Sequence, residues 1–464
     1  MIDSKQVANQ QTITLIGAGL VGSLLAVLLA KRGLRVELYE RRSDMRKADI
    51  SAGRSINLAL ANRGIYPLEQ AGLMDKVKPL LTTMKGRMVH DLDGNENFQS
   101  YGQKAEEVIY SVSRGDLNKI CLNAAEKTGL VNIHFNQNCE SVDFDNNQIQ
   151  FKHSETNEET LVNFEQIIGT DGSTSAVRDA IHQKESSQHD IIELGHSYKE
   201  LRIPAGKNGK FQIDKNSLHI WPRGGYMLIA LPNKDSSFTV TLFMPTKGET
   251  SFESLDNKEK VNDFFEIHFK DTVSLLPSLK EDFFENPIGR LATVKCNPWH
   301  YKNKALLLGD AAHAVVPFHG QGMNCGFEDA VYLAEVIDEY PNPNINWQQI
   351  FERVDNNRKE NGDAIADMAI ENYVTMRDSV RDEKFLLKSV LGFELEKRFP
   401  EFFCPRYSMV MFHRLPYAEA KERGVIQEEI LSELTESING IEFIDFHLAE
   451  NLISKKLTKV ILNP

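Results

Sequence analysis

The sequence predicts a mixed α/β protein, α+β overall, in which a Rossmann-like domain carries an inserted antiparallel β-sheet and is followed by a helical C-terminal region. Three observations predict this fold class. Residues 12–40 have the pattern strand, glycine-rich turn, helix, strand. Residues 191–295 contain strand-like runs rich in aromatic residues, such as SSFTVTLFMP at 236–245. From about residue 322 onward the pattern is mostly helical.

The first unit is a βαβ motif at the start of the chain. TITLIG (12–17) is an apolar run of strand length, AGLVGSLLAVLLAKRG (18–33) is a helix that ends at a glycine, and LRVELYE (34–40) is a second strand. We expect helices within 62–80 and over 116–129, and strands within 86–112 and 131–169. KALLLGDAAH (304–313) returns to the pattern of a buried strand followed by glycine.

This order predicts four segments. Residues 1–190 form the first part of the Rossmann-like domain, with strands in 86–112 contributing to the substrate side. Residues 191–295 form the substrate-binding antiparallel sheet, 296–375 the return part of the Rossmann-like domain, and 376–464 a C-terminal helical cap.

Composition excludes several functions. The chain has 464 residues and a formal net charge of −13, which disfavours nucleic acid and anionic membranes as partners. Its five cysteines form no CxxC pair, which indicates a reducing, cytoplasmic location and no structural zinc. The polar N-terminus is not a signal peptide, and no apolar run is long enough to span a membrane, so we expect a soluble protein. A homodimer is left open, and the tail at 447–464 is expected to form a surface helix.

A dinucleotide site is predicted at the first βα turn. Gly17, Gly19 and Gly22 form GxGxxG between a strand and a helix, where glycines allow a tight turn and a close approach of backbone to a pyrophosphate. Glu40 ends the second strand, where its carboxylate can accept hydrogen bonds from ribose hydroxyls. The alternative is a tight helix–strand junction without a ligand. Arg41 follows Glu40 and superficially suits an NADP phosphate, but Glu40 would repel that phosphate.

Two later motifs favour FAD. GTDGSTSAVR (169–178) places Asp171 in a turn after a strand. LLLGDAAH (306–313) ends a strand on Asp310, whose carboxylate can bind the flavin ribitol chain. PFHGQGMNCGFEDA (317–330) then supplies Gly320 and Gly322 before a helix, whose N-terminus can stabilise negative charge on the reduced flavin. In this order the motifs resemble the single-component FAD-dependent aromatic hydroxylases over about residues 10–340. That resemblance implies no separate NAD(P)H domain.

The stretch GRSINLALANRG (53–64) fits this interpretation. In such a fold the loop after the second strand returns beside the flavin ring, where small residues allow a close approach. Arg54 is then expected to reach a phosphate or a nearby acid, and Leu58 and Ala59 to contact the flavin. The alternative is the start of a helix with a buried apolar face.

A longer set of motifs is more specific. GRSINLALANRG, GRMVHDLDG (86–94), HIWPRG (219–224), TLFMP (241–245), GDAAHAVVPFHGQGMNCGFED (309–329) and ENYVTMRD (371–378) together resemble the kynurenine 3-monooxygenase family. The resemblance implies bound FAD, hydroxylation of L-kynurenine in tryptophan catabolism, and NADPH and O₂ as co-substrates. The family's mammalian members end in a membrane-spanning tail, which this sequence does not show, so we expect a soluble form like that of the bacterial members. It also implies further FAD contacts. These are Leu20, Arg114, Met323, Asn324 and, through its backbone, Cys139.

The same resemblance implies a substrate site. Arg87 stands where the family binds the substrate carboxylate, and a bidentate guanidinium suits that group. Tyr101, Asn372 and Tyr407 match the polar residues around it. Phe243, Phe318 and Met376 match the apolar slot for the aromatic ring, and His319 is expected to contact the substrate ketone or a water. No side chain is expected to act as a catalytic acid or base, and no metal is expected.

Three other functions stay open at this point. The chain could hydroxylate a different aromatic acid. It could be an NAD(P)-linked dehydrogenase, which the 169–178 and 306–329 motifs disfavour. It could be a non-catalytic FAD-binding redox protein, for which no docking motif is visible in the sequence.

Overall fold

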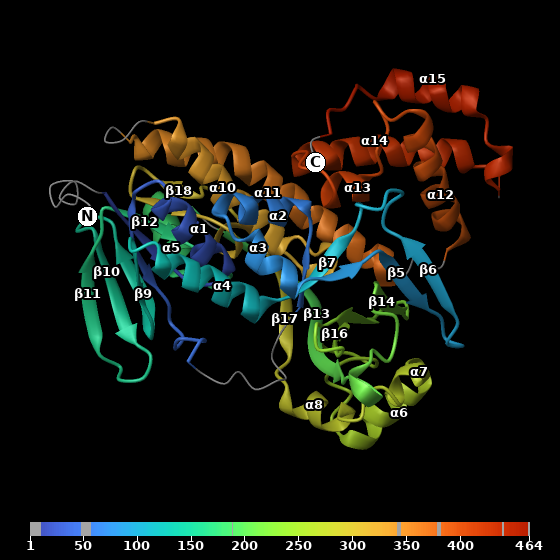
Figure 1. The fold of residues 1–464 in the computed structure, drawn as a ribbon, viewed down its shortest axis with the longest axis horizontal. Coiled ribbons are helices and arrows are strands. Elements are labelled where there is room, and N and C mark those ends of the chain that lie inside the picture. Colours follow the sequence, from blue (N-terminus) through green and yellow to red (C-terminus); the bar gives the residue numbers. More distant parts are fainter. Residues whose placement is uncertain are drawn as a thin grey trace.

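A computed structural model describes residues 11–47, 57–187, 189–340, 345–377, 382–438 and 440–462. Its first layer is a six-stranded sheet in the order β18-β19-β12-β1-β2-β8. Strands β12 and β18 of this sheet are labelled in Figure 1. All neighbours pair in parallel except β18 and β19, which are antiparallel. The strands are β1 (Thr12–Ile16), β2 (Arg35–Tyr39), β8 (Val131–His134), β12 (Gln166–Gly169), β18 (His300–Tyr301) and β19 (Ala305–Leu307).

The predicted βαβ motif is confirmed, with α1 (Leu20–Ala30) between β1 and β2. Ten of the eleven residues of α1 are buried, since the helix lies between the sheet and further helices. One apolar core joins α1 to α4 (Arg114–Lys127), α10 (Gly322–Asp338) and α11 (Trp347–Arg377). This packing fixes the start of α1 and the start of α10 relative to the carboxyl ends of the parallel strands, where open α/β sheets bind ligands.

A second, seven-stranded sheet has the order β17-β13-β16-β15-β14-β5-β6. It contains β5 (Gly86–His90), β6 (Glu96–Ser100), β13 (His189–Ile203), β14 (Ser217–Pro222), β15 (Met227–Pro232), β16 (Phe238–Pro245) and β17 (Gly289–Cys296). Only β5 and β14 pair in parallel. The register sets Arg87 opposite Leu218 and Tyr198 opposite Phe243, so residues from distant parts of the chain share one face.

Two three-stranded sheets complete the β-structure. One has the order β3-β7-β4, from β3 (Asn57–Leu60), β4 (Thr82–Met84) and β7 (Ile109–Ser113). The other joins β9 (Gln137–Asp143), β10 (Gln148–His153) and β11 (Glu159–Asn163). Of the strands expected in 86–112, β5 and β6 lie in the seven-stranded sheet. Strand β7 lies in the other sheet, where it pairs with β3 on one side and β4 on the other.

The remaining elements are helical. They are α2 (Asn62–Ala71), α3 (Met74–Val77), α5 (Ala176–Glu185), α6 (Lys258–His268), α7 (Lys270–Val273), α8 (Leu279–Glu285), α9 (Asp310–His313), α12 (Glu383–Arg398), α13 (Arg406–Met411), α14 (Tyr417–Thr435) and α15 (Phe446–Lys456), with short 3₁₀ turns that include η4 (Pro317–His319). Helices α6 to α8 lie within the segment expected to be a sheet, which the sequence interpretation missed. The segment boundaries expected from the sequence stay a prediction.

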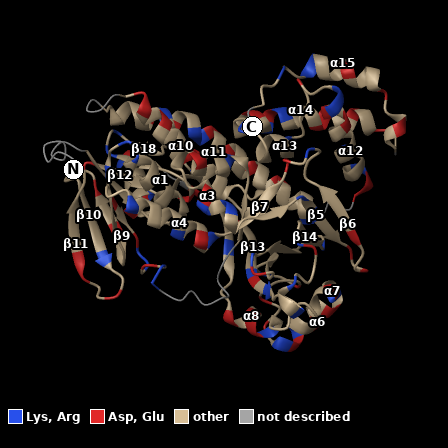
Figure 2. Cartoon of the chain, viewed as in Figure 1, with Lys and Arg blue, Asp and Glu red and all other residues tan. Residues whose placement is uncertain are grey.

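The helices α12 to α15 lie together at one end of the molecule, beside β5 and β6 (Figure 1). Acidic and basic residues are mixed along the outer helices, such as α6, α8 and α14, rather than separated by sign (Figure 2). Within the described residues, no helix has the length and apolar character that a bilayer crossing requires.

Candidate active site

One cavity of about 910 Å³ lies between the two large sheets. That volume is at the upper end of the range for small-molecule and cofactor sites, roughly 300–1,000 Å³. Most predicted site residues line it. From the cofactor set these are Gly19, Leu20, Arg41, Leu58, Ala59, Arg114, Asp171, Asp310, Gly320, Gly322 and Met323, and from the substrate set Arg87, Tyr101, Phe243, Phe318, His319, Asn372, Met376 and Tyr407.

Five predicted cofactor residues do not line this cavity, and one lies outside the described residues. Gly17, Gly22, Glu40, Cys139 and Asn324 are the five, and Arg54 is the residue outside the described ranges. Cys139 lies on β9 and packs against the core beneath the sheet. Gly17, Gly22, Glu40 and Asn324 lie behind the residues of the cavity wall and support them.

The glycine-rich turn has the geometry that its sequence predicts. Gly17 has φ of +99°, which favours glycine, and its N–H donates to the Tyr39 carbonyl at 2.7 Å. A Cβ on Gly22 would lie 2.0 Å from the Gly17 carbonyl oxygen, so only glycine allows α1 to start this close to β1. A Cβ on Gly19 would meet nothing within 4 Å, and Gly19 lines the cavity. The turn is therefore packed on its inner side and open towards the cavity.

Glu40 supports this turn from the end of β2. Its Oε2 accepts the Ala18 N–H at 2.9 Å, and its Oε1 accepts the backbone N–H and the Nε–H of Arg42 at 3.0 and 2.7 Å. Burial acts to raise the pKa of the Glu40 carboxyl, but the hydrogen bonds outweigh it and the pKa lies below its ordinary value. Glu40 is therefore ionised beside the turn, and Arg41, not Arg42, faces the cavity.

Two aspartates mark the far side of the turn. Asp171 accepts the Ala176 N–H at the start of α5 with Oδ2, whereas its Oδ1 is buried without a partner. Burial raises the pKa of Asp171, because the carboxylate lacks full solvation. Asp310 begins α9 and is exposed on the cavity wall. An unpartnered buried carboxylate oxygen and an open glycine turn fit a ligand that carries hydroxyl donors and a diphosphate, as FAD does.

The stretch around Leu58 forms strand β3, not the start of a helix, which begins only at Asn62. Leu58 and Ala59 line the cavity. Opposite them, Gly320 has φ of +65°, and a Cβ there would lie 3.0 Å from the Ala59 Cβ. This close approach places the start of α10 beside β3.

Asn324 fixes that approach but does not face the cavity. Its Oδ1 accepts the Ala61 N–H at 3.0 Å, and its Nδ2 donates to the carbonyls of Ala59 and Gly320 at 2.9 and 2.8 Å. The side chain is fully buried, so its hydrogen-bonding groups hold the cavity wall together. The Asn324 side chain therefore holds β3 against the start of α10, and the role of Asn324 as a cofactor contact stays a prediction.

A cationic and aromatic cluster occupies one end of the cavity. The Arg87 guanidinium carbon lies 5.0 Å from the ring centre of Tyr407 and 5.6 Å from that of Tyr101. The two tyrosine rings stack with centres 5.3 Å apart. Arg87 Nε and the Tyr101 hydroxyl are buried without hydrogen-bond partners. Burial raises the pKa of both tyrosines, so their hydroxyls stay protonated and can donate to an anion.

An apolar wall lies next to this cluster. Phe243 meets Phe318 edge to face with ring centres 4.9 Å apart, and Phe318 stacks on Tyr373 at 3.9 Å. Asn372 donates to the Phe318 carbonyl at 2.6 Å and to the Met376 sulfur at 3.3 Å. Asn372 therefore holds this wall by two hydrogen bonds in addition to lining the cavity.

His319 lies between the two regions. Its ring stacks on Tyr407 with centres 5.7 Å apart, and its Nδ1 is buried without a partner. Burial, with a smaller contribution from the nearby Arg406 and Arg87 charges, lowers the pKa of His319 to about 3. The imidazole is therefore neutral near pH 7 and offers a hydrogen-bonding nitrogen to a ligand.

The sequence interpretation missed wall residues from β13 and the end of α13. Tyr198 and Glu200 line the cavity from β13, and Met411 lines it from α13. Burial raises the pKa of Glu200. Tyr198 and Glu200 are two residues apart on a strand, so their spacing predicts that they share one face of the sheet. The spacing does not predict that this face lines the cavity.

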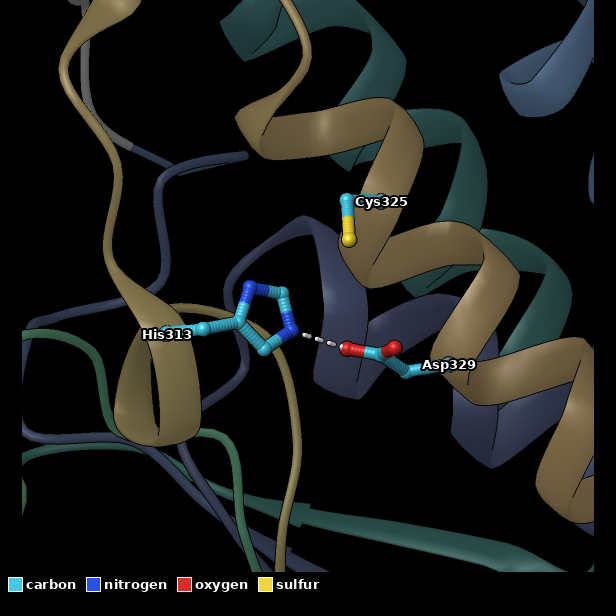
Figure 3. A group of neighbouring side chains, drawn as sticks. All are labelled: His313, Cys325 and Asp329. Carbon is cyan, nitrogen blue, oxygen red and sulfur yellow. Dashed lines mark hydrogen bonds and ion pairs between the residues drawn. The ribbon is translucent and has the colours of Figure 1, made fainter. Parts of the chain in front are cut away.

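His313, Cys325 and Asp329 are the one group of potential metal ligands found among the described residues (Figure 3). His313 Nε2 lies only 2.5 Å from Asp329 Oδ2, whereas two ligands of one metal ion, each about 2.0–2.2 Å from it, stand roughly 3.3 Å apart. Arg358 also contacts two of the three groups, at 2.8 Å from Asp329 and 3.6 Å from the Cys325 sulfur. The geometry fits a hydrogen-bonded ion pair rather than a metal site.

Comparison with known proteins identifies a family. A family model described as an FAD binding domain matches residues 10–341. The chain is 46% identical over 451 residues to the kynurenine 3-monooxygenase of Myxococcus xanthus, which covers 97% of this chain and 96% of that protein. It is 44% identical over 458 residues to the kynurenine 3-monooxygenase of Dictyostelium discoideum, with 96% and 98% covered.

Solved structures support the fold. A tetrameric form of 2-methyl-3-hydroxypyridine-5-carboxylic acid oxygenase matches with a TM-score of 0.64 at 19% identity, covering 80% of this chain and 94% of that chain. PqsL of P. aeruginosa, in complex with 2-aminobenzoylacetate, matches with a TM-score of 0.64 at 17% identity, covering 80% and 97%. At such identities the likeness concerns the fold alone.

Proposed function

The chain belongs to the kynurenine 3-monooxygenase family, and on that premise we propose that it is an FAD-dependent monooxygenase that hydroxylates L-kynurenine to 3-hydroxy-L-kynurenine with NADPH and O₂ as co-substrates. The observation that supports this function best is the continuity of one cavity. It joins the glycine-rich turn at Gly19 to the buried cluster around Arg87, so a flavin and an amino-acid substrate can lie side by side.

In this proposal FAD would be held by residues from four elements, α1, α9, β3 and α10. The open face at Gly19 and the N-terminus of α1 bind the diphosphate, Asp310 binds the ribitol chain, and β3 with the start of α10 contacts the flavin ring. FAD held there would supply the redox chemistry of the reaction, which couples oxidation of NADPH to the transfer of one oxygen atom from O₂ to the aromatic ring. The residues of the chain bind, orient and shield these reactants.

The amino-acid head of the substrate binds at the cationic end. Arg87 pairs with the substrate carboxylate. The protonated hydroxyls of Tyr101 and Tyr407 donate hydrogen bonds to the same carboxylate, directly or through a water molecule. Support comes from Arg87 Nε and the Tyr101 hydroxyl, which are buried yet lack partners within the chain. A buried donor without a partner costs about 1–3 kcal/mol, so a ligand that accepts from it is favoured.

The aniline ring lies against the apolar wall. Phe243, Phe318 and Met376 are 3–6% exposed and present apolar side chains to the cavity. This wall orients the carbon next to the amino group towards the flavin and excludes water from the reacting centre. Exclusion of water matters because activated oxygen is otherwise released as H₂O₂.

In this proposal His319 contacts the substrate but does not transfer a proton. Its neutral imidazole faces the cavity between the carboxylate end and the ring wall, where Nδ1 can hydrogen-bond the substrate ketone or a water. A general base near pH 7 needs a pKa close to that pH, and the pKa of His319 at about 3 is too low.

One experiment tests the proposal. The purified protein should be yellow with bound FAD, and its oxidation of NADPH should rise when L-kynurenine is added, with a product one oxygen heavier by mass spectrometry. Stimulated NADPH oxidation without an oxygenated product would show that kynurenine is only an effector. No stimulation by L-kynurenine, but stimulation by another aromatic acid, would assign a different substrate. FAD binding with no stimulated turnover would indicate a non-catalytic redox protein.

We also propose a cytoplasmic location, since Cys121, Cys139, Cys296, Cys325 and Cys404 are all free thiols. A homodimer is a further proposal that light scattering at micromolar protein concentration would test.

A further inference from the structure

The buried carboxylate of Asp329, in the middle of α10, accepts hydrogen bonds from three residues, two at the ends of α9 and one on α11. Its Oδ2 accepts the Gly309 N–H at 3.0 Å and the His313 Nε2–H at 2.5 Å (Figure 3). Its Oδ1 accepts the Nε–H of Arg358, on α11, at 2.8 Å. Asp329 is 0% exposed and does not line the cavity.

Among these donors, Gly309 is the one next to the cavity wall, because its neighbours Leu308 and Asp310 both line the cavity. Gly309 has φ of +60° and ψ of −141°, a backbone conformation that L side chains rarely adopt, and it directly precedes Asp310. Helix α9, which Asp310 begins, has only four residues. Its Ala312 and His313 N–H groups donate to the Gly309 carbonyl at 2.9 Å, but the Gly309 N–H donates to Asp329. The Asp329 carboxylate therefore anchors the turn that presents Asp310.

The turn also has little room to shift. A Cβ on Gly309 would lie 3.0 Å from a Val21 methyl group, and a Cβ on Gly326 would lie 2.6 Å from the same methyl group. Val21 lies on α1 and lines the cavity. A Cβ on Gly326 would also lie 3.3 Å from the Gly309 Cα, so the turn packs closely on the backbone of α10, with the Val21 side chain of α1 against both.

Two cations hold the carboxylate ionised. Burial acts to raise the pKa of Asp329, but the charges of His313 and Arg358 outweigh it and lower the pKa to about 2. The His313 pKa is raised well above its ordinary value, because the attraction of Asp329 outweighs burial. An ionised carboxylate has only acceptor sites, which is what three converging donors require.

We propose that Asp329 is a positioning residue for bound FAD: it fixes the Gly309–Asp310 turn, so that Asp310 meets the ribitol chain in a defined place. The inference rests on the proposed function and goes beyond it, because it assigns cofactor affinity to a residue that does not touch the cofactor.

Asp329→Asn is the variant that tests it. The amide presents one N–H₂ group to the three donors, so at least one hydrogen bond is lost whichever way the amide turns. We expect the FAD dissociation constant, measured on the apoprotein by quenching of flavin fluorescence, to rise about ten- to hundred-fold. The double variant with Asp310→Ala should lose little more affinity than Asp310→Ala alone, because both act through the same contact.

Two controls separate positioning from general destabilisation. Asp367→Asn also removes a carboxylate that pairs with two cations, Lys295 and Lys421. Asp367 does not line the cavity. It should lower Tm and leave FAD affinity within about two-fold. His313→Gln keeps an N–H donor for Asp329 without the positive charge, and should change FAD affinity less than about three-fold.

The outcomes are distinct. Equal loss of FAD affinity in Asp329→Asn and Asp367→Asn, or no loss in Asp329→Asn, would overturn the inference and leave the proposed function standing. A wild-type chain that binds no FAD would overturn both. If Asp329→Asn does not fold, hydrogen exchange of the wild-type apoprotein decides: the Gly309 amide should be as protected as the amides within α10, and rapid exchange would refute the inference.

Discussion

Arg87 on β5 and Tyr407 on α13 meet at the end of the cavity, with the Arg87 guanidinium carbon 5.0 Å from the centre of the Tyr407 ring. The contact joins an early strand to the C-terminal helical region. It leaves Arg87 Nε buried and unpartnered, so the arginine is oriented by an aromatic ring rather than neutralised by an acid. That combination keeps a buried cation available for an anionic ligand.

The first prediction concerns this cation. Arg87→Lys should raise the KM for L-kynurenine about ten- to hundred-fold and lower kcat much less, because lysine keeps the charge but cannot form two parallel N–H bonds to a carboxylate. Arg290→Lys is the matched control, since Arg290 also lines the cavity but its side chain is 85% exposed. Steady-state kinetics at varied kynurenine check it, and equal effects of the two substitutions would contradict it.

The second prediction concerns the glycine turn. Gly19→Val should weaken FAD binding by more than about a hundred-fold, because the new side chain occupies the open face that a diphosphate needs. Gly225→Val is the control, since a Cβ there also meets nothing within 4 Å but lies off the cavity wall. Fluorescence titration of both apoproteins measures the effect. Retention of FAD by Gly19→Val would place the diphosphate elsewhere.

The third prediction concerns the apolar wall. Phe243→Ala should lower the fraction of consumed NADPH that yields hydroxylated product and raise H₂O₂ release, because water enters the space left by the ring. Phe265→Ala removes an equally buried ring from a core that does not reach the cavity. Both should cost about 3–5 kcal/mol of stability, but only Phe243→Ala should change the product ratio. A shift in that ratio for both variants would mean that stability alone controls it.

The fourth prediction concerns pH and His319. The His319 pKa falls from an ordinary 6.5 to about 3 on burial, so below pH 6.5 the unfolded chain binds a proton that the folded chain does not. The free energy of unfolding should therefore fall as pH falls, by about 1.4 kcal/mol per pH unit from this group alone. His319→Gln should remove that part of the slope, about 2 kcal/mol at pH 5.

Urea unfolding of the apoprotein at several pH values between 5 and 7 measures this difference. Burial also lowers the pKa of His219, to about 4, so the wild type and the variant share a second slope and only their difference reports on His319. His447→Gln, at an exposed position in α15, is the control and should leave the wild-type slope unchanged. An unchanged slope in His319→Gln would show that His319 is solvated in the folded protein.

Local sequence patterns predicted the structure well where the conformation of a segment depends mainly on residues close to it in the sequence. GxGxxG between β1 and α1 predicted the turn, since Gly22 packs on the Gly17 carbonyl within the same motif. The contacts that constrain Gly17 come from Thr170 and Asp171, which are remote in sequence. The helical spacing of Val261, Phe264 and Phe265 on α6 was present in the sequence but was overlooked within a strand-rich region. The hydrogen bonds of the Asn324 side chain to Ala59 and Ala61 were not predicted, because these partners are remote in sequence.

By itself the sequence determined the βαβ motif, the mixed α/β class and the residue types that a flavin and an amino-acid substrate require, because these depend on short-range periodicity and on side-chain chemistry. Only the tertiary structure decided that Arg87 faces Tyr407 and that Asp329 anchors the Gly309 turn. Both relationships follow from the packing of whole sheets and helices against one another. Such packing depends on distances between distant segments, which no local pattern in the chain encodes.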